Sequence, residues 1–413
     1  EAALDLVIGR DQVNLLTVVV VSGVFRVGDS FTLRLGDRRG GGAGSEIFWS
    51  TTTGQLLLAV SVDGGESFRG VRTNPYEFEV VAHPEPRLLQ VLGPTVAAVN
   101  EPFDLHLAIF DRNRNVIPSF SGTVRLGHAG GSSGRPAGGL AAVGLPETVR
   151  FSPEERGVKI LGGVSFSKPG VYRVLAAADG LPGEFLSNPI VVEENPVRRI
   201  YWGDVHQHGW GDSTMHLMHV RTRKLDPLAR HRQGREIGRF DFSCPAAMSM
   251  PVDGAEAVWE AYREACAQTE APGRYIPFLA YEAHPDEGDR QVFFRNWEQE
   301  PLPVPMRSPM KEVDERYGDR DDCMLEVHIG GAPPRWDQYR PDRERMLEVC
   351  SGFGCAEWLL QRALRLGDRP AVCAASDLHL GLSGGPRALE TFRGRFGQKF
   401  PMNQRDTSYG QGP

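Results

Sequence analysis

The order of apolar and polar residues divides this chain into a strand-rich first half and a mixed second half. Apolar residues alternate with polar ones in "DSFTLRLGD" (29–37) and in "FDLHLAIF" (103–110), and turn signals such as Asp63 followed by Gly64 separate these segments. Alternation with a period of two places every second side chain on one face, which is typical of half-buried β-strands. Short strands at regular spacing, separated by turns, predict β-sandwich modules in the first half.

The pattern changes after "EENPVRRI" (193–200). Apolar residues recur at helical spacing in "GAEAVWEAYREACAQT" (254–269) and "GCAEWLLQRALRLGD" (354–368), and short apolar strands such as "YIPFLAYE" and "RPAVCAASD" flank these segments. Strands that alternate with helices predict an α/β fold, of which a barrel is one form. With a further boundary at "HPEPRLL", we expect a multidomain chain: a β module over 1–86, an immunoglobulin-like β-sandwich over 87–195 and an α/β domain over 196–413.

Composition narrows the classes of function. The 413 residues carry a net charge of −7, and no basic stripe of the kind that binds nucleic acid is visible. No apolar run approaches the roughly 18 residues that span a membrane. All six cysteines lie in the second half without a Cys-x-x-Cys pair, which favours reduced thiols in the cytoplasm over secretion and counts against a cysteine-ligated zinc. The start at Glu1 leaves a removed signal peptide open.

Histidines and carboxylates stand where predicted strands end. His206 and His208 in "YWGDVHQH" lie two residues apart on a strand, so both imidazoles point the same way, and Asp212 follows in a glycine-rich turn. Further candidates at strand ends are Glu282, His284, His328, Asp377 and His379. Catalytic sites of barrel enzymes are built at that edge of the strands. Imidazoles and carboxylates suit zinc, manganese or iron, and two such ions can share one water.

Each of these residues has an ordinary structural role when it is taken alone. A single histidine at a strand end is usually a hydrogen-bonded core or loop residue, and a single aspartate before a turn is usually a cap. Repetition changes this interpretation, because four apolar strands of one domain each end in His, Asp or Glu. We therefore predict a centre that holds one to three divalent ions.

The motifs "GDVHQH", "AYE", "VHIGG" and "ASDLH" resemble, in this order, the metal motifs of the polymerase-and-histidinol-phosphatase (PHP) superfamily. "YWGDVHQH" and "SDLHLGLSGGP" carry most of the match, and the β modules resemble a branch of uncharacterised proteins in which such modules precede a PHP-like domain. The resemblance implies a distorted (β/α)7 barrel, up to three divalent metals and hydrolysis of phosphoesters. The metal ligands that it implies are His206, His208, Glu282, His328, Asp377 and His379.

Two positions depart from the family pattern. After Asp241, where the family has Asp-His, this chain has Ala247 and Met248, and a methionine suits only soft copper(I). Asp289 stands where the family often has a histidine, and it could ligate a hard metal. We expect one metal position to be altered or lost. The polar end "QKFPMNQRDTSYGQGP" closes no barrel, so we also expect the domain to be incomplete at its C-terminus.

The leading hypothesis is hydrolysis by a metal-activated water, because a bound cation lowers the pKa of water to about 7. Asp212 or His379 would move the proton, and Arg290 and Arg295 would hold an anionic group of the substrate unless they are ordinary surface arginines. Two alternatives stay open. The domain is a metal-binding or ligand-binding relic without turnover, or it is a carbohydrate-active enzyme whose β modules recognise a glycan.

Overall fold

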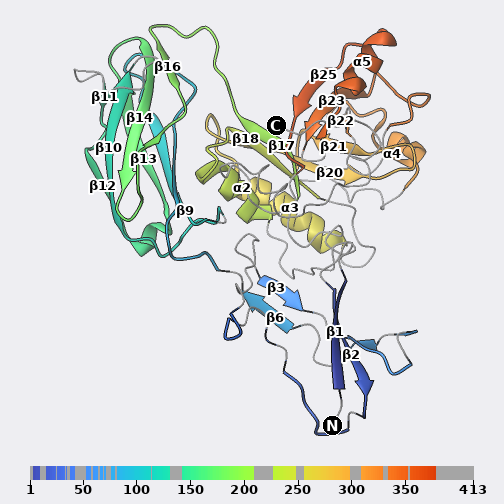
Figure 1. Cartoon of the computed structure of the whole chain (residues 1–413). Coiled ribbons are helices and arrows are strands. Elements are labelled where there is room, and N and C mark those ends of the chain that lie inside the picture. The colour runs from blue at the N-terminus through green and yellow to red at the C-terminus, as the bar shows by residue number, and fades with distance from the viewer. Residues whose placement is uncertain are drawn as a thin grey trace.

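The computed structural model describes most of the chain, and it is mostly β (Figure 1). The described residues are 3–9, 15–24, 26–32, 34, 38–41, 53–56, 59–63, 66–67, 69–70, 76–79, 81–112, 114–130, 142–208, 227–247, 255–297, 308–328, 334–351 and 354–377. Within these ranges, no helix combines the length and the apolar character that crossing a bilayer requires.

The first 80 residues contribute paired strands. The antiparallel pairs described there are β1 (Ala3–Gly9) with β2 (Leu15–Ser22), β3 (Thr53–Leu56) with β6 (Tyr76–Glu79), and β4 (Ala59–Val60) with β5 (Arg69–Gly70). Asp63, in the predicted turn, lies between β4 and β5. Its carboxylate accepts hydrogen bonds from the hydroxyl of Ser61 at 2.6 Å and the backbone N–H of Ser67 at 3.0 Å, as aspartates in turns commonly do.

The described residues between 88 and 193 form a sandwich of two sheets. One sheet has the order β12-β10-β14-β16-β8 with β15 on β14, and the other has the order β11-β13-β9-β7. The strands are β7 (Leu88–Leu92), β8 (Val96–Ala98), β9 (Phe103–Phe110), β10 (Gly122–Gly130), β11 (Ala142–Val143), β12 (Thr148–Phe151), β13 (Val158–Phe166), β14 (Gly170–Ala178), β15 (Phe185–Leu186) and β16 (Ile190–Glu193), with a 3-10 turn at Pro153–Glu155. Leu105, Leu107 and Ile109 of β9 enter the core that the two sheets share, as their alternation predicted.

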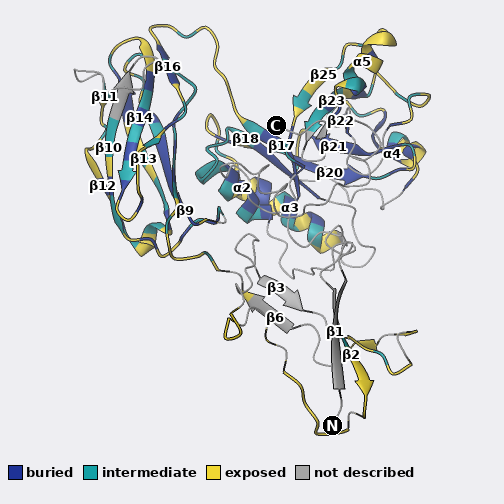
Figure 2. Cartoon of the chain, in the orientation of Figure 1, coloured by how far each residue is buried: buried dark blue, intermediate teal, exposed yellow. Residues whose placement is uncertain are grey.

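The second half contains two further sheets and the helices. The parallel sheet comprises β17 (Gly203–His208), β18 (Phe242–Ala246) and β19 (Ile276–Pro277). The mixed sheet comprises β20 (Leu279–Ala283), β21 (Arg290–Phe294), β22 (Cys323–Val327), β23 (Glu344–Ser351), β24 (Gly354–Cys355) and β25 (Ala371–Ala374). The helices are α2 (Pro227–Glu236), α3 (Ala255–Thr269), α4 (Met310–Tyr317) and α5 (Glu357–Arg365). Figure 2 shows that β17, β20 and β21 are largely buried.

Hydrogen bonds join the parallel and the mixed sheet on both sides. The backbone N–H of Ala247, just after β18, donates to the carbonyl of Ala280 at 3.0 Å, and the N–H of Glu282 donates back to Ala247 at 2.8 Å. On the other side, the N–H of Asp377 donates to the carbonyl of His206 at 2.8 Å. The strand ends that carry the candidate ligands are thereby brought to one place.

Alternation along the strands separates an inner face from an outer face. Apolar side chains from six strands pack together on the inner face: Val205, Cys244, Ala246, Ala280, Phe293, Met324 and Met346. On the outer face, Tyr281, Val292 and Phe294 pack against α3 and α4. Successive residues of one strand therefore face different surroundings, which decides the role of each polar residue there.

The barrel prediction required regular alternation of strand and helix, and the described elements of the second half do not follow it throughout. Only the short link 284–289 joins β20 to β21, so the two strands pair antiparallel, and β21 also pairs antiparallel with β22. A parallel pair needs a crossover of a dozen or more residues, which this link is too short to provide. Among the described strands of this half, parallel pairing joins β17-β18-β19 and β22-β23-β25, and an isolated parallel bridge between Ala247 and Tyr281 joins the end of β18 to β20.

The sandwich contacts the end of α2. Gln90 of β7 donates from Nε2 to the carbonyl of Ile237 at 2.8 Å, and His106 of β9 donates from Nδ1 to the carbonyl of Glu236 at 2.7 Å. The last carbonyls of a helix have no partner within the helix, so these side chains satisfy groups that would otherwise need water. The sandwich therefore stabilises the helix that packs on β18.

We expect Gly203→Ala to destabilise the second half of the chain. A Cβ at Gly203 would lie 2.2 Å from the carbonyl oxygen of Phe242 on the neighbouring strand. Overpacking of this kind costs about 1–3 kcal/mol, so the midpoint of thermal unfolding should fall. Gly127→Ala in β10 is the control, because nothing lies within 4 Å of a Cβ there. Equal midpoints for both variants would contradict the close approach of β17 and β18.

His231 of α2 predicts a specific pH dependence of stability. Nδ1 of this buried ring lies 2.8 Å from Oη of Tyr275 and 3.3 Å from Oγ of Ser243, and burial, aided by Arg235, lowers its pKa from 6.5 to about 3. The folded-state pKa is lower than the unfolded one, so only the unfolded state takes up the proton between these values. The full contribution of the neutral ring to the free energy of unfolding is therefore present above pH 6.5. It is lost as the pH falls toward 3, and the free energy of unfolding falls by at most about 1.4 kcal/mol per pH unit.

Thermal unfolding between pH 7.5 and 4.5 tests this dependence. His231→Gln should flatten the fall of the midpoint with pH, whereas Tyr275→Phe, which keeps the buried imidazole, should retain it. The same slope in wild type and His231→Gln would show that His231 does not titrate as expected.

Candidate metal centre

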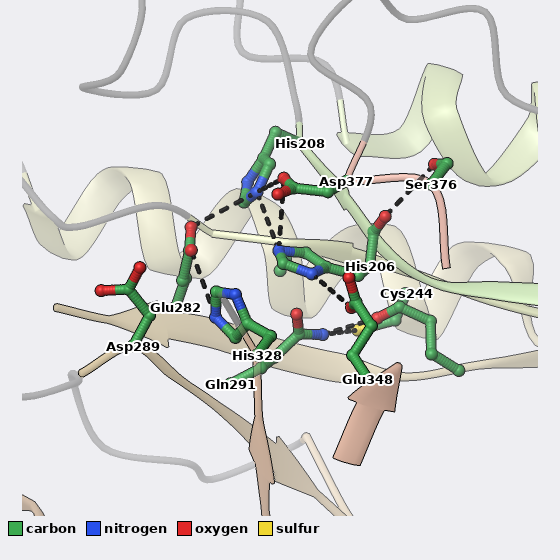
Figure 3. Close-up of polar contacts among 12 residues, drawn as sticks. His206, His208, Cys244, Glu282, Asp289, Gln291, His328, Glu348, Ser376 and Asp377 are labelled. Carbon is green, nitrogen blue, oxygen red and sulfur yellow. Dashed lines mark hydrogen bonds and ion pairs between the residues drawn. The ribbon is translucent and has the colours of Figure 1, made fainter. Parts of the chain in front are cut away.

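Five of the predicted ligands meet at one point. They are His206 and His208 of β17, Glu282 of β20, His328 after β22 and Asp377 after β25. Each is at most 3% exposed. Figure 3 shows their side chains pointing toward one another from separate strands. The structure thus brings these strand-end side chains together.

The first group of candidate ligands contains His206, His208 and Asp377. Nε2 of His206 lies 3.1 Å from Nε2 of His208 and 3.5 Å from Oδ1 of Asp377, and Nε2 of His208 lies 3.1 Å from the same oxygen. Neighbouring ligand atoms around a tetrahedral ion with zinc–nitrogen bonds of about 2.0–2.1 Å are about 3.3 Å apart. The spacing of these atoms therefore fits one shared ion.

Glu282 borders the first group and belongs to a second with His206 and His328, whose candidate ligand atoms all lie within 4.8 Å of one another. Oε1 of Glu282 lies 3.3 Å from Nε2 of His328, and Oε2 lies 3.3 Å from Nε2 of His208. The two oxygens of one carboxylate therefore face different imidazoles, an arrangement that suits a ligand shared between neighbouring ions.

A third group extends the cluster to the link between β20 and β21. Nδ1 of His284 lies 3.0 Å from Oδ1 of Asp289, and Nε2 lies 3.4 Å from Oε2 of Glu282. Neither Nε2 of His284 nor Oε2 of Glu282 makes a hydrogen bond within the described part of the chain, although both are buried. Atoms of this kind fit the role of metal ligands.

Burial and neighbouring charges shift the pKa values of the cluster in different directions. Burial alone would lower the pKa of His206, but the carboxylates of Asp377 and Glu348 outweigh it and raise that pKa well above 6.5. Burial lowers the pKa of His328 to about 4. Electrostatic interactions with the rings of His284 and His208 outweigh burial at Glu282 and lower its pKa. Because ligation requires an unprotonated ring nitrogen, metal binding should release protons from this cluster.

The backbone of Asp377 is held in an uncommon conformation. Its φ of +45° lies in the left-handed region, which aspartate tolerates better than most residues other than glycine. The adjacent Ser376 donates from its N–H to Oδ1 of Asp204 at 3.0 Å, and that carboxylate also accepts the N–H of His206 at 3.2 Å. Asp204 thus ties the segment that carries Asp377 to β17. Left-handed residues held in this way cluster at functional sites.

Other predicted site residues fall elsewhere. Asp212 and His379 lie outside the described residues, as does Met248. Ala247 is buried at the end of β18 and contributes backbone hydrogen bonds but no ligand, as its side chain dictates.

The two arginines predicted to bind substrate do not join the cluster. Arg290 is fully buried, and its Nε pairs with the buried carboxylate of Glu344. Because Gln291 is the register partner of Glu282, Arg290 lies on the opposite face of β21 from the ligands. Arg295 is exposed beyond the far end of β21. The geometry therefore assigns Arg290 to the stability of the fold.

Sequence reasoning missed the carboxylates on the inner face. Oε2 of Glu348 lies 2.8 Å from Nδ1 of His206, and Glu326 of the neighbouring strand is equally buried. A signal was present, because β22 and β23 both contain the sequence Met-Leu-Glu-Val, at 324–327 and 346–349. A glutamate inside an apolar strand needs a polar partner, and its repetition in adjacent strands indicates a shared polar layer.

Comparison with known proteins adds little. No protein-family model matches the chain, and no curated protein matches it. Similar solved structures include the D00-D0 domain of Intimin, with 14% identity and a TM-score of 0.21 over 29% of this chain and 56% of that one. The CARDB domain of PF1109 from Pyrococcus furiosus, in complex with di-metal ions, has 20% identity and a TM-score of 0.18 over 28% and 94%. PhoD has 11% identity and a TM-score of 0.21 over 48% and 38%.

The chain thus spans about half the length of the Intimin structure, 56% of it. With TM-scores of 0.17 to 0.21, these similarities carry no argument about the fold or the function of this protein.

Two arginine variants test the assignment of Arg290. Arg290→Met should lower the free energy of unfolding by about 3–5 kcal/mol, because it leaves the Glu344 carboxylate buried without its positively charged partner. Arg295→Ala, at an exposed position, should change it by less than about 0.5 kcal/mol. Denaturant titration of both variants measures the difference. A near-neutral Arg290→Met would return Arg290 to the candidates for substrate binding.

Proposed function

We propose that this chain is a metal-dependent hydrolase that acts on a phosphoester or a related anionic small molecule through a metal-activated water. The observation that carries the proposal is the set of three overlapping ligand groups in one buried cluster. These groups are His206, His208 and Asp377; His206, Glu282 and His328; and Glu282, His284 and Asp289. Mixed imidazole and carboxylate ligands favour zinc, manganese or iron.

The ions would supply a water with its pKa lowered to about 7 and a positive charge for the substrate oxygens. The protein's own part is to hold the ligands and limit their motion. Glu282 contributes two oxygens that face different imidazoles, while Asp204 fixes the backbone beside Asp377. Asp212 and His379 remain the proposed proton carriers, because both follow predicted strand ends in the sequence.

The choice of phosphoesters rests on the resemblance of "GDVHQH" and "ASDLH" to PHP motifs. The finer fold, a distorted (β/α)7 barrel, is proposed on the same ground, and the hydrogen bonds that join the two sheets at Ala247 and Asp377 are compatible with it. The antiparallel β20, β21 and β22 would then be a departure particular to this chain. With Ala247 in a ligand position, we propose one or two ions and keep three as the upper bound.

A second candidate is a metal-binding relic without turnover. Ala247 favours it, since the end of β18 contributes no ligand side chain. We give less weight to a glycan-recognition role for the β modules, because Gln90 and His106 of the sandwich contact the end of α2. A cytoplasmic location fits Cys244, Cys266, Cys323, Cys350 and Cys373, which are free thiols in the structure.

Metal content and turnover test the proposal together. Elemental analysis after reconstitution with zinc, manganese or iron should give at least one ion per chain in the wild type. His206→Ala should lose most of that metal and lower turnover of a phosphoester panel by at least about 100-fold. The matched control is His83→Ala, at an exposed histidine before the sandwich, which should change neither quantity.

The outcomes separate the two candidates. Wild-type protein that retains no stoichiometric metal would refute both. Stoichiometric metal without turnover across phosphoester, ester and glycan panels would refute the hydrolase and support the relic.

A further inference from the structure

We infer that Glu348 is a positioning residue of the metal centre, whose carboxylate fixes the ring of His206 so that Nε2 faces His208 and Asp377. This inference rests on the proposed metal centre. Nδ1 of His206 lies 2.8 Å from Oε2 of Glu348, and the two side chains are 0% and 2% exposed. Figure 3 shows Glu348 behind the ring of His206, on the side away from His208.

The hydrogen bond settles which nitrogen of His206 can ligate. An ionised carboxylate can only accept, so opposite ionised Glu348 the Nδ1 of His206 carries the proton and donates it. The lone pair of the neutral ring then lies on Nε2, the atom that is 3.1 Å from Nε2 of His208 and 3.5 Å from Oδ1 of Asp377. Without that acceptor, the ring could place its proton on the ligating nitrogen.

The topology explains why Glu348 can play this part. It lies in β23, which pairs in parallel with β25, the strand that leads to Asp377. Met346, two residues before it, packs on the inner face, so alternation directs Glu348 to that face as well. β23 therefore places the carboxylate of Glu348 at Nδ1 of His206, while the neighbouring β25 leads to Asp377, which is itself a candidate ligand.

Glu326 supplies a closely matched comparison. It occupies the same place in the Met-Leu-Glu-Val sequence of β22, is 0% exposed, and has an oxygen near those of Glu348. Its Oε1 accepts a hydrogen bond from Sγ of Cys373 at 2.6 Å. The two glutamates share burial, sequence context and surroundings, but the hydrogen bond to Nδ1 of His206 is made by Glu348 and not by Glu326.

A carboxylate that accepts from the outer nitrogen of a ligating histidine fixes the ring and raises its basicity. Loss of such a partner typically weakens metal affinity by about 10- to 100-fold. Glu348→Gln keeps the size of the side chain and removes its charge. We therefore expect Glu348→Gln to weaken zinc binding by about that factor, and Glu326→Gln to change it by less than about threefold.

The first measurement uses metal-free protein, so it does not depend on the proposed function. In 15N-histidine-labelled wild type, NMR should show a protected Nδ1–H signal of His206, assigned by its loss in His206→Ala. Glu348→Gln should remove or strongly shift this signal, and Glu326→Gln should leave it in place. An unchanged signal in Glu348→Gln would overturn the inference.

The second measurement is zinc affinity, by competition with a chromogenic chelator. Equal loss of zinc affinity in Glu348→Gln and Glu326→Gln would also overturn the inference, and so would no loss in either variant. In both cases the hydrogen bond between Glu348 and His206 would have no effect of its own on metal binding. If the wild type binds no zinc, the proposed function fails. The NMR result still shows whether Glu348 accepts the hydrogen bond from Nδ1 of His206. Circular dichroism checks folding, and Glu348→Asp, which withdraws the carboxylate by one methylene, replaces Glu348→Gln if that variant does not fold.

Discussion

The rest of the structure depends on bringing buried imidazoles and carboxylates from separate strands within about 3.5 Å of one another. Charged groups are costly to bury unless opposite charges, hydrogen bonds or a metal compensate them. Here His206 lies between Asp377 on one side and Glu348 on the other, at 3.5 and 2.8 Å. Such proximity is maintained only if the strands that carry these residues cannot slide. The hydrogen bond from the N–H of Asp377 to the carbonyl of His206 is therefore as necessary to the cluster as its side chains.

Layers outside the cluster hold these strands in place. Asp204 accepts hydrogen bonds from both β17 and the segment after β25, and Gln291 donates from Nε2 to the carbonyl of Val205 at 2.5 Å. Farther out, α2 packs on β18 through His231, and the sandwich satisfies the carbonyls at the end of that helix. Because side chains of the sandwich donate hydrogen bonds to the C-terminal end of α2, the sandwich limits the motion of that helix. This placement gives the sandwich a structural reason to precede the candidate metal cluster in the same chain.

Much of the cluster could be predicted from local sequence, whereas pairing across strands could not. The spacing of His206 and His208 dictates a common direction, and Glu282, His328 and Asp377 could be recognised because each ends an apolar segment. The antiparallel pairing of β20 and β21 was missed because the pattern of each strand is the same in either direction. The face of β21 on which Arg290 lies depends on how β21 pairs with Glu282 of β20, and the sequence does not reveal this pairing. Arg290 was therefore expected at the site. Glu348 was missed because its partner is 142 positions away in the chain.

Ala247 at the end of β18 shows how the backbone and the ligands of the cluster can have separate roles. Ala247 keeps the two hydrogen bonds that join β18 to β20, one of them to the N–H of Glu282. These bonds need no side chain, so a ligand can be lost there while the carboxylate of Glu282 stays in position. The remaining groups share His206 and Glu282 and do not include β18 at all. The side chain at this position could therefore differ without dispersing the ligands, which is why metal stoichiometry and turnover have to be measured separately.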